Sequence, residues 1–443
     1  MFTEHRANLF KALGKDCAFM SSGTSQCRYD TDTDIYFRQE SNFYYYTGCT
    51  DPDCYAIFNG ESKATTLFVP KLGPEHALWI GIIESNDEKQ NRLSLNVMYT
   101  EELDAQIDTL KDRTFHVALD IPTIPNYAVP NAVNDLRVIS GEIRLYKDPV
   151  EIKNIELSSL ANKAAFTFIL SSFKQGMFEY EAEGMHKYII AKHGCKVQSF
   201  EAKTATGQNA STLHWVNNMF EAKEGDTFLC DAGCEHDLYV SDNTRVFPVS
   251  QRFTKMQEEL YETVLTANKV AIAAVKPGIK MEELHLIALA EILKGLRKYG
   301  LVKEKLNFED QMSAGIPCVF MPHGLGHLIG LDVHDVGAFN EQVKRSTDPR
   351  CARLRTTRTL TEGMTFTIEP GLYFIDGFLN AAKNDPQKGK HINFDVVEIY
   401  RKQCGGYRSE DDILVTKDGH YVFPAAVKEV KEIHYLRDLA FQK

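Results

Sequence analysis

Short apolar runs alternate with polar stretches in the first third of the chain. The spacing of its apolar residues predicts one helix over residues 4–13 and another over residues 101–110. Runs rich in β-branched and aromatic residues predict strands over residues 55–58, 65–69, 97–99 and 116–119. We therefore predict a mixed α/β domain over residues 1–145.

A capped helix start marks the beginning of a second domain, residues 146–443. Asp148 can cap this helix, Pro149 occupies its first position, and Glu151 follows three residues after the cap. The helix is predicted to run towards Phe173, and a second helix is predicted over residues 180–192. These two helices open the second domain as a consecutive pair.

The same order of elements recurs further along the second domain. Thr254 and Gln257 form a capping box for a helix that runs to about Val275, and another helix is predicted over residues 281–299. A predicted β-hairpin lies between the two helix pairs, and further β-prone runs follow the second pair. This order indicates two duplicated helix–helix–sheet halves, although the halves share no visible sequence identity. The predicted fold class is α+β.

Length and composition narrow the class of protein. The chain has 443 residues, 43% of them apolar, and a net charge of −11 without any run of Lys and Arg. Two or more domains are therefore expected, and nucleic acids and anionic membranes are not expected as partners. Charges interrupt the N-terminal segment throughout, so we expect neither a signal peptide nor a membrane span and predict a cytoplasmic protein. The ten cysteines show no CxxC spacing, and we expect reduced core thiols, Cys230 and Cys234 included.

The stretch over residues 227–245, TFLCDAGCEHDLYVSDNTR, contains the first candidate chemistry. It reads as a strand that ends on Asp231, a break at Gly233, and a second β-prone run over residues 237–240 that leads to Asp242. A hairpin of this kind brings two distant carboxylates together. Asp is depleted in strands, and either Asp alone is better explained as a turn residue. The pair becomes a metal site only if further ligands are found downstream.

Four downstream stretches supply further polar residues. The first, PHGLGH with VHD after it, has two histidines spaced as in a zinc-binding helix, but its glycines favour a loop or strand that offers imidazoles to a cleft. Glu369 ends a predicted strand before a Pro-Gly turn, and Glu410 opens an acidic run that leads into another strand. The fourth stretch, residues 354–358, is basic. Taken singly, a histidine of the first stretch could be a structural imidazole, and Glu369 could be a surface residue at the end of a strand. The acidic run over residues 410–412 could be a solvated charge run.

As a set, these residues have the composition of a two-metal hydrolase site. Four carboxylates and one imidazole match the charge and the donor preference of two divalent ions, with Mn²⁺ favoured and Co²⁺ or Zn²⁺ possible. Two ions roughly 3.5–4 Å apart can hold one hydroxide between them and polarise a carbonyl group. The carboxylates that we expect in this set are Asp231, Asp242, Glu369 and Glu410.

The same motifs resemble those of the pita-bread metallopeptidases, and among them the Xaa-Pro peptidases. DAG at Asp231, SDNTR at Asp242, PHGLGH with VHDVG, TIEPG at Glu369 and GGYRSEDD at Glu410 follow the family's order through most of residues 200–420. FRQES, residues 37–41, is similar to prolidases. The resemblance implies an aminopeptidase P-like N-terminal domain over residues 1–145 and a pita-bread catalytic domain with pseudo-duplicated halves over residues 146–443.

The resemblance also implies a role for each residue that matches. One ion would be chelated by Asp231, both would be bridged by Asp242 and Glu410, and the other would be completed by His327 and Glu369. Glu369 would in addition relay a proton to the leaving nitrogen. The residues implied around the substrate are His214, His323, His334, Arg355 and Arg408. Of these, His334 would steady the oxyanion, Arg355 would hold the proline carboxylate, and Arg408 would orient Glu410. The sequence departs from the family at Phe200, Asn243 and Ser409, and these positions bear on metal tuning.

The activity that the resemblance implies is a manganese-dependent Xaa-Pro dipeptidase. Its substrates would be small peptides with proline in second position, whose tertiary amide lacks the N–H that most peptidases need. The nearest alternative is aminopeptidase P, which acts on longer peptides, but HGLGH, FRQES and Arg355 favour the dipeptidase. A non-catalytic pita-bread binding protein would have lost ligands, and a creatinase-like amidinohydrolase lacks this ligand set. We expect a homodimer.

Overall fold

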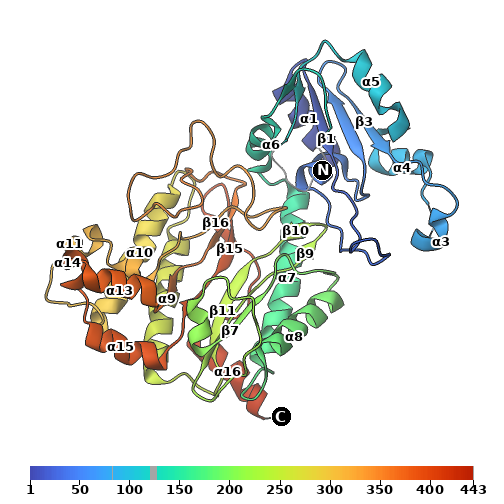
Figure 1. Cartoon of the computed structure of the whole chain (residues 1–443). Helices are drawn as coiled ribbons and strands as arrows, with labels where there is room; N and C mark the ends of the chain where they lie inside the picture. Colours follow the sequence, from blue (N-terminus) through green and yellow to red (C-terminus); the bar gives the residue numbers. More distant parts are fainter. Residues whose placement is uncertain (82, 120–126, 443) are drawn as a thin grey trace. The chain divides into compact units, whose positions relative to one another are not determined.

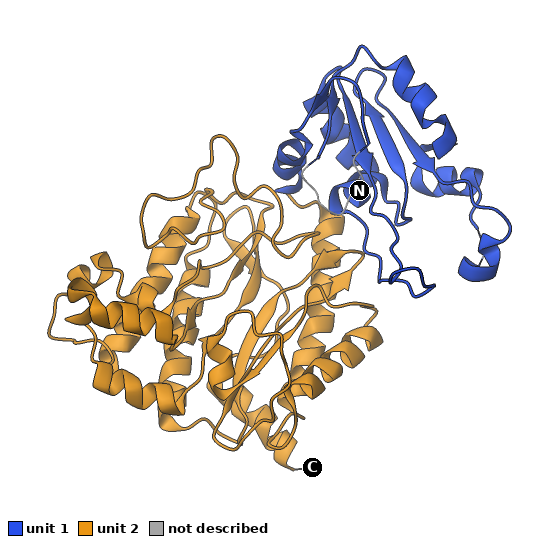
Figure 2. Ribbon diagram, in the orientation of Figure 1, with its two compact units in different colours: residues 1–145 blue, residues 146–443 orange. Residues whose placement is uncertain are grey.

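The structure, a computed structural model, describes residues 1–81, 83–119 and 127–442 (Figure 1). The chain forms two compact units, Met1–Leu145 and Tyr146–Lys443 (Figure 2). Among the described helices, none combines the length and the apolar character needed to cross a membrane.

The first unit contains a mixed sheet and short helices. In its described residues the sheet has six strands in the order β4-β3-β2-β1-β5-β6, with β1–β5, β3–β4 and β5–β6 parallel. The elements are α1 (Phe2–Leu13), β1 (Cys17–Ser21), α2 (Ser41–Thr47), β2 (Tyr55–Asn59), β3 (Ala64–Val69), α3 (His76–Ile80), α4 (Asn86–Leu93), β4 (Asn96–Tyr99), α5 (Leu103–Thr109), β5 (Phe115–His116), β6 (Ala132–Val133) and α6 (Leu136–Arg144).

The predicted elements of this unit are present, but three of its strands, β1, β5 and β6, differ from expectation, and β6 was not predicted. The strand expected over residues 116–119 is only Phe115–His116. Strand β1 was not predicted, and all five of its residues are buried. A strand buried on both faces has no alternation of apolar and polar residues, so periodicity does not reveal it.

The second unit contains two helix pairs and several small sheets. Its elements are α7 (Pro149–Leu170), α8 (Glu179–Lys192), β7 (Lys203–Thr206), β8 (Thr227–Ala232), β9 (Glu235–His236), β10 (Tyr239–Val240), β11 (Asn243–Pro248), α9 (Lys255–Ala273), α10 (Met281–Lys298), α11 (Phe308–Ser313), α12 (Pro317–Phe320), β12 (Thr365–Ile368), β13 (Gly371–Leu372), α13 (Asp376–Asn384), α14 (Pro386–Gly389), α15 (Phe394–Gln403), β14 (Tyr407–Arg408), β15 (Asp411–Val415), β16 (His420–Val422) and α16 (Val430–Phe441).

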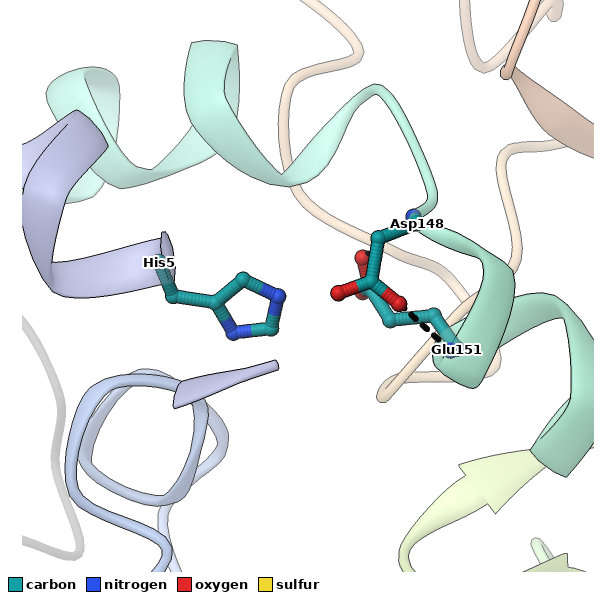
Figure 3. A group of neighbouring side chains, drawn as sticks. All are labelled: His5, Asp148 and Glu151. Atoms are coloured by element: carbon teal, nitrogen blue, oxygen red, sulfur yellow. Dashed lines mark hydrogen bonds between the residues drawn. The ribbon is translucent and has the colours of Figure 1, made fainter. Parts of the chain in front are cut away.

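Helix α7 begins where its capping signal predicts. The Asp148 carboxylate accepts a hydrogen bond from the backbone N–H of Val150 at 2.7 Å and another from that of Glu151 at 2.9 Å, of which Figure 3 shows the second. The Glu151 carboxylate in turn accepts from the Asp148 N–H at 2.8 Å. This reciprocal cap satisfies donors that the first turn of a helix otherwise leaves without partners. Local sequence therefore determines where the second unit starts its first helix.

The predicted duplication of the second unit is visible in its layers. A three-stranded antiparallel sheet, β11-β8-β7, accompanies the α7–α8 pair, and a second one, β12-β15-β16, accompanies the α9–α10 pair in the described residues. Helix α7 packs against β9, β10 and β11, whereas α9 packs against β12, β13 and β14. In Figure 1 the two helix pairs flank the strands of the two halves. An isolated β-bridge between Thr244 and Glu410 joins the first half to the second.

The predicted hairpin that begins with β8 exists, but our prediction of its return strand was wrong. Strand β8 pairs along its full length with β11, and residues 237–240, the predicted return strand, belong to a smaller hairpin of β9 and β10 at the tip. The chain reverses at Asp237 and Leu238, whose φ angles are 47° and 64°, and not at Gly233. Gly233 instead allows a close approach, because a Cβ atom there would lie 1.8 Å from the Ser241 carbonyl oxygen.

Candidate metal centre

The β8–β11 ladder positions the first two carboxylates. Asp231 lies near the end of β8, opposite Thr244, and Asp242 lies immediately before β11. The extra residues of the tip hairpin return the chain to the same end of the ladder. Both side chains are buried, with 9% and 7% of their surfaces exposed. The register of β8 and β11, and not a tight turn, thus brings the Asp231 and Asp242 carboxylates together as we predicted.

Glu410 reaches these carboxylates through Thr244. The Glu410 N–H donates to the Thr244 carbonyl at 3.1 Å, and the Thr244 hydroxyl donates to Glu410 Oε2 at 2.6 Å. The Glu410 side chain is 3% exposed. Asp411 and Asp412 are equally buried, so the run over residues 410–412 is not a solvated charge run.

The HGLGH stretch is a loop and not a helix, as we expected, and backbone hydrogen bonds join it to β12. Thr367 donates its N–H to the His327 carbonyl at 2.8 Å, and Glu369 donates its N–H to the Leu325 carbonyl at the same distance. A Cβ atom at Gly326 would lie 1.8 Å from the Thr367 carbonyl oxygen, so this position requires glycine. The close approach brings His327 and Glu369 to the same end of the strand pair.

The imidazole of His327 lies between three carboxylates. Its Nε2 atom is 3.5 Å from Asp242 Oδ2, 3.8 Å from Glu369 Oε1 and 4.0 Å from Glu410 Oε1. One donor atom each from Asp242, His327 and Glu410 can be chosen so that all lie within 4.8 Å of one another. The fourth carboxylate, Asp231, accepts a hydrogen bond at its Oδ2 atom from Arg408 Nη2 at 2.6 Å.

All of the predicted site residues line one cavity of about 1020 Å³ in the second unit. The His323 Nδ1 atom is 3.9 Å from Glu369 Oε2, and the ring of His334 meets that of His327 edge to face, with 4.4 Å between centroids. Arg355 is exposed yet lines the same cavity. The structure therefore gathers these side chains: Asp231, Asp242, His327, Glu369, Glu410, His214, His323, His334, Arg355 and Arg408.

The chain matches the sequence model of metallopeptidase family M24 over residues 153–417, and that of the aminopeptidase P N-terminal domain over residues 2–117. It belongs to metallopeptidase family M24. The Xaa-Pro dipeptidase of Homo sapiens is 31% identical to it, with 98% of this chain and 92% of the relative aligned. A probable Xaa-Pro aminopeptidase of Sordaria macrospora is 33% identical over 91% of this chain and 87% of the relative.

A solved aminopeptidase structure confirms the predicted fold class. The Pseudomonas aeruginosa aminopeptidase PepP superposes with a TM-score of 0.84 at 27% identity, covering 100% of this chain and 99% of that one. The chain therefore combines an aminopeptidase P-type N-terminal domain with an M24 catalytic domain, and both contain helices and sheets.

Electrostatics in the M24 site favour a bound cation. Burial, followed by the neighbouring carboxylates, raises the pKa of Asp242 and of Glu410 well above the ordinary value. The Oδ1 atoms of Asp231 and Asp242 are buried and have no hydrogen-bond partner among the described residues. Carboxylate oxygens that face one another without donors are the ligands that a divalent metal ion requires. The donor set therefore fits the metal ions of this family.

Burial lowers the pKa of each histidine of the M24 site, which favours the neutral imidazole. Burial lowers the pKa of His323 to about 3, and burial followed by the neighbouring His327 lowers the pKa of His334 to about 3. The His323 Nδ1–H donates to the Gly324 carbonyl at 2.8 Å, while its buried Nε2 atom has no hydrogen-bond partner in the part of the chain that the structure describes. Neutral imidazoles can donate or accept a hydrogen bond toward a substrate.

Arg408 was predicted, but three residues that support the M24 site, Thr244, Arg245 and Lys203, were not. Arg408 does not hold Glu410 directly but through Thr244, whose hydroxyl accepts from Arg408 Nε at 2.9 Å. Arg245 is fully buried and donates to the Glu410 carbonyl at 2.7 Å and to Asp411 Oδ1 at 2.6 Å. Thr244 and Arg245 are both part of the SDNTR motif, and this motif is the sequence feature from which their roles could have been predicted. Lys203, 3.5 Å from Asp231, carried no signal in the sequence.

The three departures from the family pattern have different surroundings. Asn243 accepts from Asn162 Nδ2 at 3.0 Å and is part of a buried polar network behind the site. The Ser409 hydroxyl is buried and has no hydrogen-bond partner among the described residues. The ring of Phe200 lies 3.7 Å from the ammonium group of Lys203.

Proposed function

We propose that this protein is an Xaa-Pro dipeptidase that uses two divalent ions, with Mn²⁺ as the metal. One observation carries the proposal: four carboxylates and the His327 imidazole converge in a cavity that also contains histidines and an exposed arginine. Oxygen donors with one imidazole suit Mn²⁺. The similarity to the human Xaa-Pro dipeptidase over nearly the whole chain supports the substrate class.

The proposed ligands are shared between two ion positions. The residues that would hold the two ions are Asp231, Asp242, His327, Glu369 and Glu410. When bound, such a pair of ions supplies Lewis acidity that lowers the pKa of a water molecule and polarises a carbonyl group. Thr244 and Arg245 hold Glu410 in place, and the N–H of Asp242 is held by Asp412 Oδ2 at 3.0 Å.

The remaining side chains act on the substrate and its protons. Glu369 is 19% exposed to the cavity, which suits a carboxylate that accepts a proton and passes it to the proline nitrogen of the leaving group. His323 and His334 are neutral and can hydrogen bond to the peptide, with His334 beside the carbonyl oxygen. His214 contributes to the wall of the same cavity. Arg408 keeps Asp231 in position through the bond at 2.6 Å.

Arg355 is the proposed determinant of substrate length. Its guanidinium lines the cavity and has no hydrogen bond or ion pair to another described residue, so it can receive a carboxylate. In an Xaa-Pro dipeptide the proline carboxylate is the free C-terminus, and a guanidinium can bind it with two parallel hydrogen bonds.

A second candidate function is that of an Xaa-Pro aminopeptidase. The cavity of about 1020 Å³ is large enough for a peptide longer than two residues, and the Sordaria relative and the Pseudomonas structure are aminopeptidases by name. In this case the residue after proline would continue past Arg355.

One set of assays separates the two candidates. The purified protein is loaded with Mn²⁺, its metal content is measured, and Gly-Pro, Ala-Pro and an Xaa-Pro tripeptide are compared by kcat/KM. We expect two ions per chain at saturation and higher kcat/KM on the dipeptides. Preference for the tripeptide would establish the aminopeptidase, and turnover by a metal-free sample would overturn the metal-dependent mechanism.

A further inference from the structure

A second cavity, of about 980 Å³, lies within the first unit. Its walls are formed by α1, by the turn between β2 and β3 with the start of β3, and by α4 with the segment that leads into β4. Three of its lining residues are cationic, Arg6, Lys11 and Lys63, and none of the described residues that line it carries a carboxylate. The chain as a whole has a net charge of −11. A concave surface with charge of one sign attracts ligands of the opposite sign, so this lining indicates an anion.

Arg6 is the buried cation of this cavity, with 6% of its surface exposed. Its Nη1 atom donates to the Tyr46 carbonyl at 3.0 Å, and its Nη2 atom donates to the Thr3 hydroxyl at 3.2 Å and to the Ser94 carbonyl at 3.3 Å. All three acceptors are neutral oxygen atoms. Burial lowers the pKa of this guanidinium, but arginine still stays protonated at physiological pH. A buried charge is costly unless an opposite charge accompanies it, so an anion beside Arg6 would be stabilised.

Thr65 offers a hydrogen-bond donor to the same cavity. It lies on β3, lines the cavity and is 8% exposed. Its buried hydroxyl has no hydrogen-bond partner among the residues that the structure describes. Such a group loses the hydrogen bond that water would give it in the unfolded chain, and an oxygen atom of a ligand can restore that bond. The buried part of the cavity therefore contains both an uncompensated positive charge and a donor without an acceptor.

Lys11 and Lys63 lie at the mouth of the cavity, because both side chains are exposed and line it. Lys63 has no hydrogen bond or ion pair to any other described residue. The acidic residue of the same turn, Glu61, forms an ion pair with Arg113 instead. Positive charge is thus available at two depths, one buried and one exposed.

We propose that this cavity binds a small organic polyanion, with one anionic group in its buried part at Arg6 and Thr65. A second anionic group of the ligand lies near Lys11 and Lys63 at the mouth. The partly buried ring of Phe10 belongs to the same lining and can pack against the carbon atoms of the ligand. Phosphate and carboxylate groups share the required chemistry, since both accept charged hydrogen bonds. Every lining residue belongs to the first unit, so the inference does not depend on the proposed peptidase function.

Calorimetric titration of the full-length protein, as purified, tests the site with three probes: pyrophosphate, citrate and inorganic phosphate. We expect pyrophosphate or citrate to bind at this site more tightly than inorganic phosphate, because only the larger anions reach both groups of cations. Added NaCl should weaken the binding, since salt screens the attraction between charges. Tighter binding of pyrophosphate would assign the site to phosphate compounds, and tighter binding of citrate would assign it to carboxylates.

Charge reversal at the mouth locates the bound probe. Lys63→Glu and Lys11→Glu should each weaken the binding of the tighter polyanion by ~10-fold or more, the effect of losing one charged hydrogen bond. Both positions are exposed, so the melting temperature should stay near that of wild type. Lys111→Glu is the matched control, because this lysine is exposed in the same unit and lies outside the cavity lining. It should keep the wild-type affinity.

Thr65→Val tests the buried part of the site. Valine has nearly the shape of threonine and suits a strand, so the variant should fold and lose no thermal stability. It should nevertheless bind the polyanion more weakly, because the donor is gone. A residue with a purely structural role would not show this combination of retained stability and weaker binding.

Two results would overturn the site. One is a wild-type protein that binds neither pyrophosphate nor citrate. The other is binding that Lys63→Glu and Lys11→Glu both leave at the wild-type affinity, which would place the probe elsewhere on the chain. Peptidase assays decide the proposed function separately.

Discussion

Glu410 shows how one residue can be prepared for a metal ion by its neighbours. The Thr244 hydroxyl holds Oε2 at 2.6 Å, and Oε1 then faces the His327 imidazole at 4.0 Å. Because Arg408 donates to the same hydroxyl, the orientation of Glu410 is coupled to that of the cation at Asp231. Each of these side chains is buried, so rotation of any one would leave a polar group without its partner.

Glu369→Gln tests the proposed proton transfer. An amide cannot accept the proton and is a poor metal ligand, so kcat/KM on Ala-Pro should fall by ~10²–10⁴-fold, the usual contribution of an acid–base group. The melting temperature of the metal-free protein should stay near that of wild type. Glu362→Gln, an exposed position in the preceding turn, is the control. A Glu369→Gln enzyme that keeps most of its turnover would exclude this role.

Arg355→Ala tests the proposed carboxylate contact. Loss of a charged hydrogen bond should weaken kcat/KM for Xaa-Pro dipeptides by about 1.5 kcal/mol, the lower end of the usual range because the side chain is exposed. Xaa-Pro tripeptides, which lack a carboxylate at this point, should change much less. Arg355→Lys should restore part of the loss, since ammonium lacks the planar fork. Equal losses on both substrate lengths would contradict the contact.

At the scale of elements, α7 and α8 support the metal centre through a buried polar chain. His186 on α8 donates its Nε2–H to Asn162 Oδ1 at 2.8 Å, and Gln198 donates to His186 Nδ1 at 3.0 Å. Asn162 on α7 in turn donates to Asn243, the residue after Asp242. The neutral imidazole satisfies this chain, and a protonated one would not, since it has no acceptor nitrogen left.

The chain of hydrogen bonds predicts a loss of stability in acid. Burial, and after it the charge of Lys187, lowers the pKa of His186 to about 3 in the folded protein. The unfolded chain binds this proton near pH 6.5, so folding loses free energy as pH falls below that value, by at most about 1.4 kcal/mol per pH unit for one group. Urea unfolding at pH 7 and pH 5 measures the loss.

Substitution isolates the contribution of His186. The urea midpoint of His186→Gln should change less between pH 7 and pH 5 than that of wild type, because glutamine does not titrate. His193→Gln, at the exposed end of the same helix, should keep the wild-type pH dependence. A His186→Gln protein with the full wild-type dependence would assign the acid sensitivity to other groups.

At the scale of the whole molecule, the metal centre should contribute to stability as well as to catalysis. Its carboxylates come from both halves of the second unit, so ions bound there link the two halves only in the folded state. Free Mn²⁺ at 100 times its dissociation constant should stabilise the native state by about 2.7 kcal/mol per site. Thermal unfolding with Mn²⁺ and with chelator checks this. An unchanged melting temperature would contradict a site confined to the folded state.

Local rules accounted for much of the fold. Both predicted capping boxes begin helices, because such caps depend on residues within one turn. Prediction failed where distant partners decide: β1 is buried on every side, and β11 was mistaken for a shorter return strand. Strand pairing is set by burial against other elements, which a short stretch of sequence does not contain.

The sequence by itself determined the types of residue in the metal centre and their order along the chain, because ligand chemistry belongs to the side chains themselves. Only the tertiary structure decided that Thr244 and Glu410, 166 residues apart, share a hydrogen bond, and that residues 410–412 are buried. It also decided that Lys203 faces Asp231, through the register of two strands. Burial and register depend on partners far along the chain, and these partners meet only when the two halves of the second unit pack together.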